Sequence, residues 1–310
     1  MTPRPDPPRL HDIGSPRCAT AGRDGKPLSV PGRTLPVLVV VFILSLALSG
    51  CGLKGGPGRP EALTSGQAPT LWTDFIAGSG KPVQSFSLSA SLSVQSPQKS
   101  ARLLVKFWGD LDRPLRLDLS TGMGQIFSMW REDSLGWLAV YPLSNQVFTH
   151  SDTKAALSKL GMPLPFGMKE LAAITTGRFG LILPATYKSV KKTAKGYDFA
   201  LAQPCPVASV TLDFEGNPIH LTGRGVEPWS ADLGEFQTMG PAEGGGLGHE
   251  FLAQKIQLTT PGGLQVILRV KKLELSPTPM DPKTLELPLP PTAKHIPLDR
   301  PGDVSAPEMP

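Results

Sequence analysis

The chain has 310 residues, of which 33 are glycine, 34 are proline and 40% are apolar, a composition that suits one or two turn-rich domains and excludes a long rod or an all-helical bundle. Its formal net charge is +5, but the first fifty residues hold six of the 31 basic and three of the 26 acidic side chains, which leaves 25 against 23. Because the basic excess lies mainly in this leader, the charge does not indicate a nucleic-acid-binding protein.

An apolar run over residues 37–48 is followed directly by Ser49, Gly50 and Cys51. A bilayer span takes roughly 20 apolar residues, so this shorter run indicates the core of a signal peptide. Leu48-Ser49-Gly50-Cys51 also matches the lipobox pattern of bacterial lipoproteins, in which the cysteine thiol receives diacylglycerol. A short membrane anchor with an incidental cysteine is the alternative.

We therefore expect residues 1–50 to be removed as leader and signal peptide, and Cys51 to carry diacylglycerol and an N-linked acyl chain. Several acyl chains anchor a protein stably, whereas one chain binds only marginally. Gly52 stands where inner-membrane retention signals often have aspartate, so by resemblance to sorted lipoproteins we expect anchoring in the outer membrane of a Gram-negative bacterium, facing the periplasm. Cys205 is then the one ordinary thiol, and we expect it to be buried and inert.

Residues 51–70 are rich in glycine, proline, serine and threonine, which predicts a flexible tether behind the lipid. From residue 83 to 95 apolar residues then alternate with serines, a period of two that predicts a half-buried strand. The apolar positions are Phe86, Leu88, Ala90, Leu92 and Val94.

The pattern predicts further strands, separated by turn signals rich in glycine, aspartate and proline, at 101–108, 114–120, 125–131, 135–141, 146–150, 197–202, 207–214, 218–223, 254–260 and 264–275. Between the sixth and seventh strands of the resulting order, the period changes to that of two short helices. One is capped by Ser151-Asp152 and stops at Gly161, and the other covers residues 167–176.

This layout predicts an α+β fold that is mainly β: a curved antiparallel sheet or incomplete β-barrel, with two short helices covering its concave face. We assign residues 71–275 to this half-barrel domain. Residues 276–310 are rich in proline and are predicted to form an extended C-terminal tail.

The stretch from about Gln84 to Arg178 resembles the LolB family, the outer-membrane receptor that accepts lipoproteins and inserts them, and more distantly the LolA carrier. The resemblance rests on the order and spacing of several short pieces. They are Lys99-Ser100-Ala101-Arg102 leading to Phe107-Trp108, then the run 116–124 that ends in Gly122-Met123-Gly124, then Phe148 and Asp152 before a helix, and Gly161-Met162-Pro163-Leu164-Pro165 before the next.

In that family a protruding hairpin bears an exposed leucine, in a Pro-Leu-Gly sequence, that drives insertion into the membrane. The matching position here is Met123, between Gly122 and Gly124. Methionine is apolar and flexible, so the resemblance implies a membrane-insertion loop at this turn. The alternative is an ordinary turn residue that folds back on the core.

The resemblance further implies an apolar cavity for acyl chains. The apolar candidates for its wall are Phe107, Leu117, Phe127, Met129, Trp137, Leu138, Met162, Leu164, Phe166 and Met168, although the same residues would describe a packed core. The implied function is to receive client lipoproteins from a LolA-like periplasmic carrier and insert them, as a monomer that contacts membrane lipid. The alternative is a structural or assembly lipoprotein that uses the same fold to dock a protein partner.

The sequence does not favour an enzyme. His150, His220 and His249 are widely spaced, and the sequence has no metal-spaced Cys/His group, no His-Glu-x-x-His and no Gly-x-Ser-x-Gly. We interpret His150 and His220 as hydrogen-bonded strand residues and the acidic pair Glu132-Asp133 as a solvated turn. No catalytic residue, no metal site and no cofactor beyond the lipid on Cys51 is predicted.

Overall fold

The computed structural model describes residues 67–78, 82–162, 164–224, 228–239 and 250–300, and all of them belong to one compact unit that begins at Ala62. The leader, Cys51, most of the predicted tether and the last ten residues lie outside the described residues, so their predictions stay predictions. No helix in the described ranges is both long enough and apolar enough to span a membrane.

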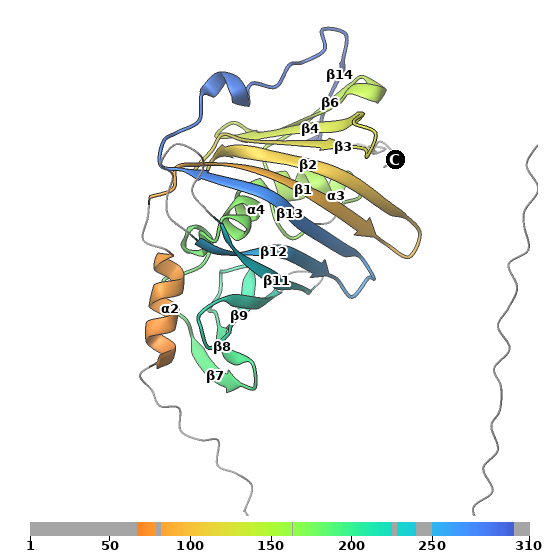
Figure 1. Ribbon diagram of the computed structural model, residues 1–310. Coiled ribbons are helices and arrows are strands. Elements are labelled where there is room, and N and C mark those ends of the chain that lie inside the picture. The colour runs from red at the N-terminus through yellow and green to blue at the C-terminus, as the bar shows by residue number, and fades with distance from the viewer. Residues whose placement is uncertain (1–66, 79–81, 163, 225–227, 240–249, 301–310) are drawn as a thin grey trace, which may run out of the picture. The chain divides into compact units, whose positions relative to one another are not determined.

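The described residues form one curved, unclosed sheet (Figure 1). Its strands run in the order β14-β6-β5-β4-β3-β2-β1-β13-β12-β11-β10-β9-β8-β7, and every neighbouring pair is antiparallel except β14 with β6. The strands are β1 (Ser85–Gln95), β2 (Ser100–Asp110), β3 (Leu115–Ser120), β4 (Ile126–Asp133), β5 (Gly136–Tyr141), β6 (Gln146–His150), β7 (Ser189–Thr193), β8 (Gly196–Ala200), β9 (Val207–Leu212), β10 (Pro218–Gly223), β11 (Trp229–Met239), β12 (Glu250–Thr259), β13 (Gln265–Ser276) and β14 (Lys294–Pro297).

Three α-helices in the described part of the chain accompany the sheet: α2 (Gln67–Ala77), α3 (Thr153–Lys159) and α4 (Met168–Thr175). Figure 1 shows α3 and α4 inside the curve of the sheet. The side chain of Asp152 caps α3 by accepting a hydrogen bond from Ala155 N–H at 2.7 Å. The predicted fold class, a curved antiparallel sheet with helices on its concave side, is thus confirmed.

Helix α2 is an element that the sequence pattern did not predict, and it begins at Gln67, inside the range assigned to the tether. Proline is tolerated in the first turn of a helix, where Pro69 lies, so the tether-like composition did not prevent helix formation. Trp72 anchors the helix, because its ring lies 5.0 Å from that of Phe199 on β8 and its indole N–H donates to Ala185 O at 2.9 Å.

The C-terminal segment crosses the convex face of the sheet and then joins it. Short 3-10 turns lie at η1 (Pro142–Ser144), η2 (Phe179–Leu181) and, in this segment, η3 (Pro282–Leu285). Leu285 and Leu298 are both buried, and Leu287 packs against an outer-face cluster of Met129, Val140 and Val147. The segment predicted as an extended tail is thus held against the sheet through residue 300.

The register defines two ends of the sheet, which differ in the turns that they carry. At the end that we call the open end, four consecutive hairpins turn: β5–β6 at residues 142–145, β3–β4 at 121–125, β1–β2 at 96–99 and β12–β13 at 260–264. It lies on the right in Figure 1. At the opposite, closed end lie the β2–β3, β4–β5 and β9–β10 turns.

The core is densest toward the closed end. Phe86 on β1 and Phe107 on β2 are 1% and 0% exposed, and their rings meet edge to face with centroids 4.9 Å apart. Leu115 beside them is fully buried. Interdigitation of this kind leaves no room for a ligand between β1, β2 and β3 at this end. A second, smaller pocket of about 380 Å³ lies further along the closed end, between α2, the β9–β10 turn and the strands β11 and β12.

Candidate functional site

An apolar cavity of about 560 Å³ lies between the inner face of the sheet and the helices α3 and α4. This volume falls within the range of about 300–1,000 Å³ that is usual for small-molecule sites. The cavity reaches the open end, because Gln98 and Lys99 from the β1–β2 turn and Leu264 from the β12–β13 turn line it. Among its described lining residues, only Lys99 carries a charge.

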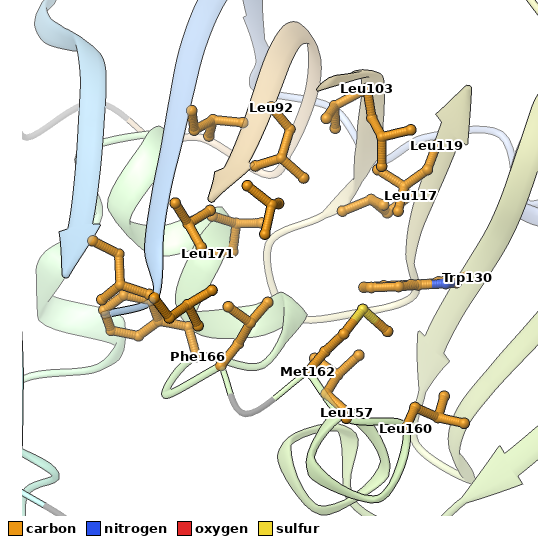
Figure 2. Close-up of a pocket in the computed structure, with 18 of the residues that line it drawn as sticks. Leu92, Leu103, Leu117, Leu119, Trp130, Leu157, Leu160, Met162, Phe166 and Leu171 are labelled. Carbon is orange, nitrogen blue, oxygen red and sulfur yellow. The ribbon is translucent and has the colours of Figure 1, made fainter. Parts of the chain in front are cut away.

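One wall of the cavity is the inner face of the strands. Strand β1 shows how the wall arises: Phe86 and Leu88 are buried in the packed core, whereas Leu92 and Val94, further along the same face, are half-buried and line the cavity. Leu103, Leu117, Leu119 and Trp130 continue this wall across β2, β3 and β4 (Figure 2).

The opposite wall comes from α3, α4 and the segment between them. Figure 2 shows Leu157, Leu160, Met162, Phe166 and Leu171 facing the leucines of the sheet across the cavity. Proline at 163 and 165 and glycine at 161 and 167 keep the connecting segment from continuing either helix. The linker therefore spans the cavity without filling it.

Glu132 fixes the two helices to the sheet. Its Oε2 accepts hydrogen bonds from Thr153 Oγ1 (2.6 Å) at the start of α3 and from Met168 N–H (3.2 Å) at the start of α4. Its Oε1 lies 2.7 Å from Nη2 of Arg113. Glu132 is only 4% exposed, so the interpretation of this residue as part of a solvated turn was wrong. A buried carboxylate at two helix N-termini is stabilised by both dipoles.

The predicted wall residues separate into two groups. Six of them line the cavity together: Leu117, Phe127, Met162, Leu164, Phe166 and Met168. The other four do not, namely Phe107, Met129, Trp137 and Leu138. Phe107 and Trp137 are on the inner face but within solid packing, whereas Met129 and Leu138 point to the convex face and join the outer cluster.

Several lining residues were not among the predicted ones, above all Leu92, Val94, Leu103 and Leu119. Each continues the period-two alternation of a predicted strand, which assigns it to the inner face but does not say whether that face is packed or hollow at that position. Ile256 and Leu268, which line the cavity from β12 and β13, could likewise be assigned to the inner face but not to the cavity.

Two aromatic residues give the cavity wall buried polar atoms. The indole nitrogen of Trp130 and the hydroxyl of Tyr141 have no hydrogen-bond partner among the described residues, and both side chains line the cavity. Burial raises the pKa of Tyr141 well above its ordinary value, and the nearby indole of Trp130 offsets only part of this rise. Tyr141 is therefore a neutral wall residue.

The predicted membrane-insertion loop lies in the β3–β4 turn at the open end. Met123 is 93% exposed, and it stands between Gly122 and Gly124, the latter with a φ of +84°. The neighbouring Ile126 is also exposed. The alternative that Met123 folds back on the core does not hold in this structure, and its proposed contact with membrane remains a prediction.

The described residues contain no candidate metal site. No group of three or more His, Cys, Asp or Glu in the described ranges could hold a metal ion. His150 Nδ1 accepts from Asp152 N–H at 2.8 Å, and His220 Nδ1 lies 2.7 Å from Asp232 Oδ1, so both strand histidines are hydrogen-bonded as interpreted. Cys205 is half-buried rather than buried.

No family model matches the sequence, and no curated protein matches it. Among solved structures, a LolA superfamily protein from Nitrosomonas europaea aligns with a TM-score of 0.50 at 9% identity, over 71% of this chain and 97% of that protein. A DUF1329 family protein from Desulfovibrio piger aligns with a TM-score of 0.50 at 8% identity, over 70% and 95% of the two chains. At these identities the likeness shows the fold, an open barrel of the LolA type.

Proposed function

We propose that this chain is a lipoprotein of the bacterial outer membrane that takes the acyl chains of client lipoproteins into the cavity and passes them into the membrane. The observation that carries the proposal is the apolar cavity of about 560 Å³ under the helices α3 and α4. The LolA-type fold supports it, because a LolA superfamily protein has the same open barrel. The lipobox at Cys51 supplies the expected anchor.

The cavity has the properties that a site for fatty chains needs. Each methylene moved from water into an apolar wall contributes about 0.8 kcal/mol, so hydrocarbon is held without specific polar contacts. Met162 and Met168 in the wall have adaptable side chains that can fit chains of different shape. The transfer of an acyl chain between two such cavities, and from a cavity to a bilayer, requires neither nucleotide nor metal.

A structural lipoprotein that docks a protein partner is the rival function, and it would need a filled interior. The hollow between Leu117 on the sheet and Leu171 on α4 favours acyl binding instead. Mass spectrometry of lipid extracted with the purified mature protein separates the two functions. We expect acyl lipids to co-purify with the protein. If no lipid co-purifies and the protein takes up no added fatty chains, the structural function is supported instead.

A pair of tryptophan substitutions tests the cavity directly. Leu171→Trp would fill the cavity from α4, so we expect it to weaken binding of a fluorescent fatty-acyl probe at least about tenfold, the equivalent of roughly two methylenes lost from contact. Leu138→Trp makes the same change on the convex face and is the matched control. If both variants bind the probe like the unsubstituted protein, the cavity is not the acyl site.

A second experiment tests the role proposed for Met123. Transfer of a fluorescent lipoprotein from a soluble carrier to liposomes is measured with Met123→Glu, and with Leu135→Glu as control, because Leu135 is a similarly exposed apolar residue at the closed end. We expect slower transfer for Met123→Glu only. Unchanged transfer would remove Met123 from the mechanism while leaving acyl binding in place.

A further inference from the structure

Four consecutive hairpin turns of the open end form a row with a single charged residue. The β10–β11 hairpin also turns at this end, beyond the row. They succeed one another along the sheet, and each hairpin occupies two strands, so their tips are spaced about 10 Å apart. The four turns, 142–145, 121–125, 96–99 and 260–264, contain no aspartate or glutamate, and their single charge is Lys99. These four turns therefore carry no negative charge.

The first two turns of the row expose apolar side chains. Leu143, at the tip of the β5–β6 turn, is 65% exposed, and Met123, in the next turn, is 93% exposed. Leu143 lies in the middle of the 3-10 turn η1. Asn145 follows this turn as its C-cap and has a left-handed φ of +50°. Two neighbouring hairpins thus present one protruding apolar side chain each at the same end of the sheet.

Basic side chains flank these apolar tips. Lys99 lies in the next hairpin turn, and exposed Lys294 lies beside the β5–β6 turn, because its backbone N–H donates to Asn145 O at 2.9 Å. The closed end is different: Asp112 lies in its β2–β3 turn beside Arg113, and Asp110 and Asp133 end the strands β2 and β4 there. Exposed apolar tips with flanking lysines and no carboxylate suit the surface of a bilayer with anionic head groups.

We propose that the open end docks on a lipid bilayer that carries anionic head groups, with Leu143 entering the apolar layer beside Met123 while Lys99 and Lys294 meet lipid phosphates. The inference rests on the proposed function, in which Met123 contacts the bilayer. It adds a second insertion point and an orientation. Because Gln98, Lys99 and Leu264 line the cavity, docking of this edge brings the cavity opening to the lipid surface.

Vesicle co-sedimentation of residues 52–310 tests the inference, because this chain contains the whole compact unit but neither the leader nor the lipid anchor. The vesicles contain phosphatidylcholine with or without phosphatidylglycerol. We expect Leu143→Glu to weaken binding to the anionic vesicles about tenfold, and Leu135→Glu, an identical change at the closed end, to leave it unchanged. The double variant Lys99→Gln, Lys294→Gln is expected to lose the preference for anionic vesicles.

Equal effects of Leu143→Glu and Leu135→Glu, or no preference of the unsubstituted chain for anionic vesicles, would overturn the inference. So would a Leu143→Glu variant that binds vesicles normally but receives cargo slowly from a soluble carrier, because the edge would then be a protein-docking surface. Binding of the fatty-acyl probe, measured on the same samples, keeps the proposed function separate. If the protein binds the probe but does not bind vesicles, only the inference about the open end is refuted. If it binds vesicles but not the probe, the proposed acyl site is refuted.

Discussion

Along β1, β2 and β3 the closed and open ends of the sheet are built from the same strands with the same alternation, yet the closed end is packed and the open end is hollow. On β1, Phe86 is 1% exposed at the closed end, whereas Leu92 and Val94 line the cavity at the open end. At the closed end the rings of Phe86 and Phe107 pack against each other on this face, whereas at the open end the leucines face α3, α4 and the linker between them across the cavity. The alternation of the strands alone therefore does not determine where the face is hollow.

The closed and open ends of the sheet also differ in their charged side chains. The closed end has Asp110, Asp112 and Asp133 in or beside its turns, and the buried carboxylate of Glu132 ties both helices to the sheet. The four consecutive turns at the open end have two exposed apolar tips and one lysine. One end therefore provides rigidity, while the other provides the space and the surface that a lipid would use. Three sets of substitutions test whether the two ends differ in this way in solution.

The largest effect is expected from truncation of the solid core. Phe107→Ala should destabilise the protein by about 4 kcal/mol, because it leaves a new cavity in close packing. Leu119→Ala, at the hollow end, should cost only about 2 kcal/mol, because its side chain already faces open space. Urea denaturation gives both values. Equal losses would mean that the cavity is closed by packing in solution.

Removal of the link between sheet and helices should have the next largest effect. Glu132→Ala leaves Thr153 Oγ1 and Met168 N–H without their acceptor and Arg113 without its partner, so we expect a loss of about 3 kcal/mol. Hydrogen exchange should show α3 and α4 opening before the strands. Uniform exchange across sheet and helices would contradict an anchoring role for this carboxylate.

The smallest effect concerns Tyr141 and appears only at high pH. Since burial raises its pKa, the folded state keeps the phenolic proton above about pH 10, where the unfolded chain releases it. The folded state then binds more protons, so this contribution to stability is full below about pH 10 and falls as the pH rises. The free energy of unfolding of the Tyr141→Phe variant should therefore fall less steeply with pH above about pH 10, by up to about 1.4 kcal/mol per pH unit. Parallel stability profiles of the two proteins from about pH 9 to 11 would refute it.

Much of the fold could be predicted from the sequence, because the period of two in strands such as β1 and the caps of α3 are local signals. Strands β7 and β11 were missed for local reasons as well: β7 is a short, polar edge strand, and the alternation of β11 is interrupted at Glu235, which has a φ of +55°. Helix α2 was not predicted, because the residues before and at its start have a composition typical of linkers.

The candidate site was only partly predictable. Apolar residues near the helix linker, such as Met162 and Phe166, could be assigned to a wall because the linker could not continue a helix. Whether Phe107 or Leu119 faces the void depends on which side chains meet across the sheet, and this is set by residues far apart in the chain. No local pattern indicated that the carboxylate of Glu132 would be buried at the start of both helices.

The C-terminal segment has a consequence for how molecules of this protein behave toward one another. An unclosed sheet has two free edges, and an exposed edge invites another chain to add a strand. Here β14 occupies the β6 side and ends at Pro297, which has no N–H to offer, while the opposite margin is the short strand β7 with Lys191 and Lys192. Both margins are poor templates for further pairing, so the barrel can stay open for a ligand without assembling into fibres.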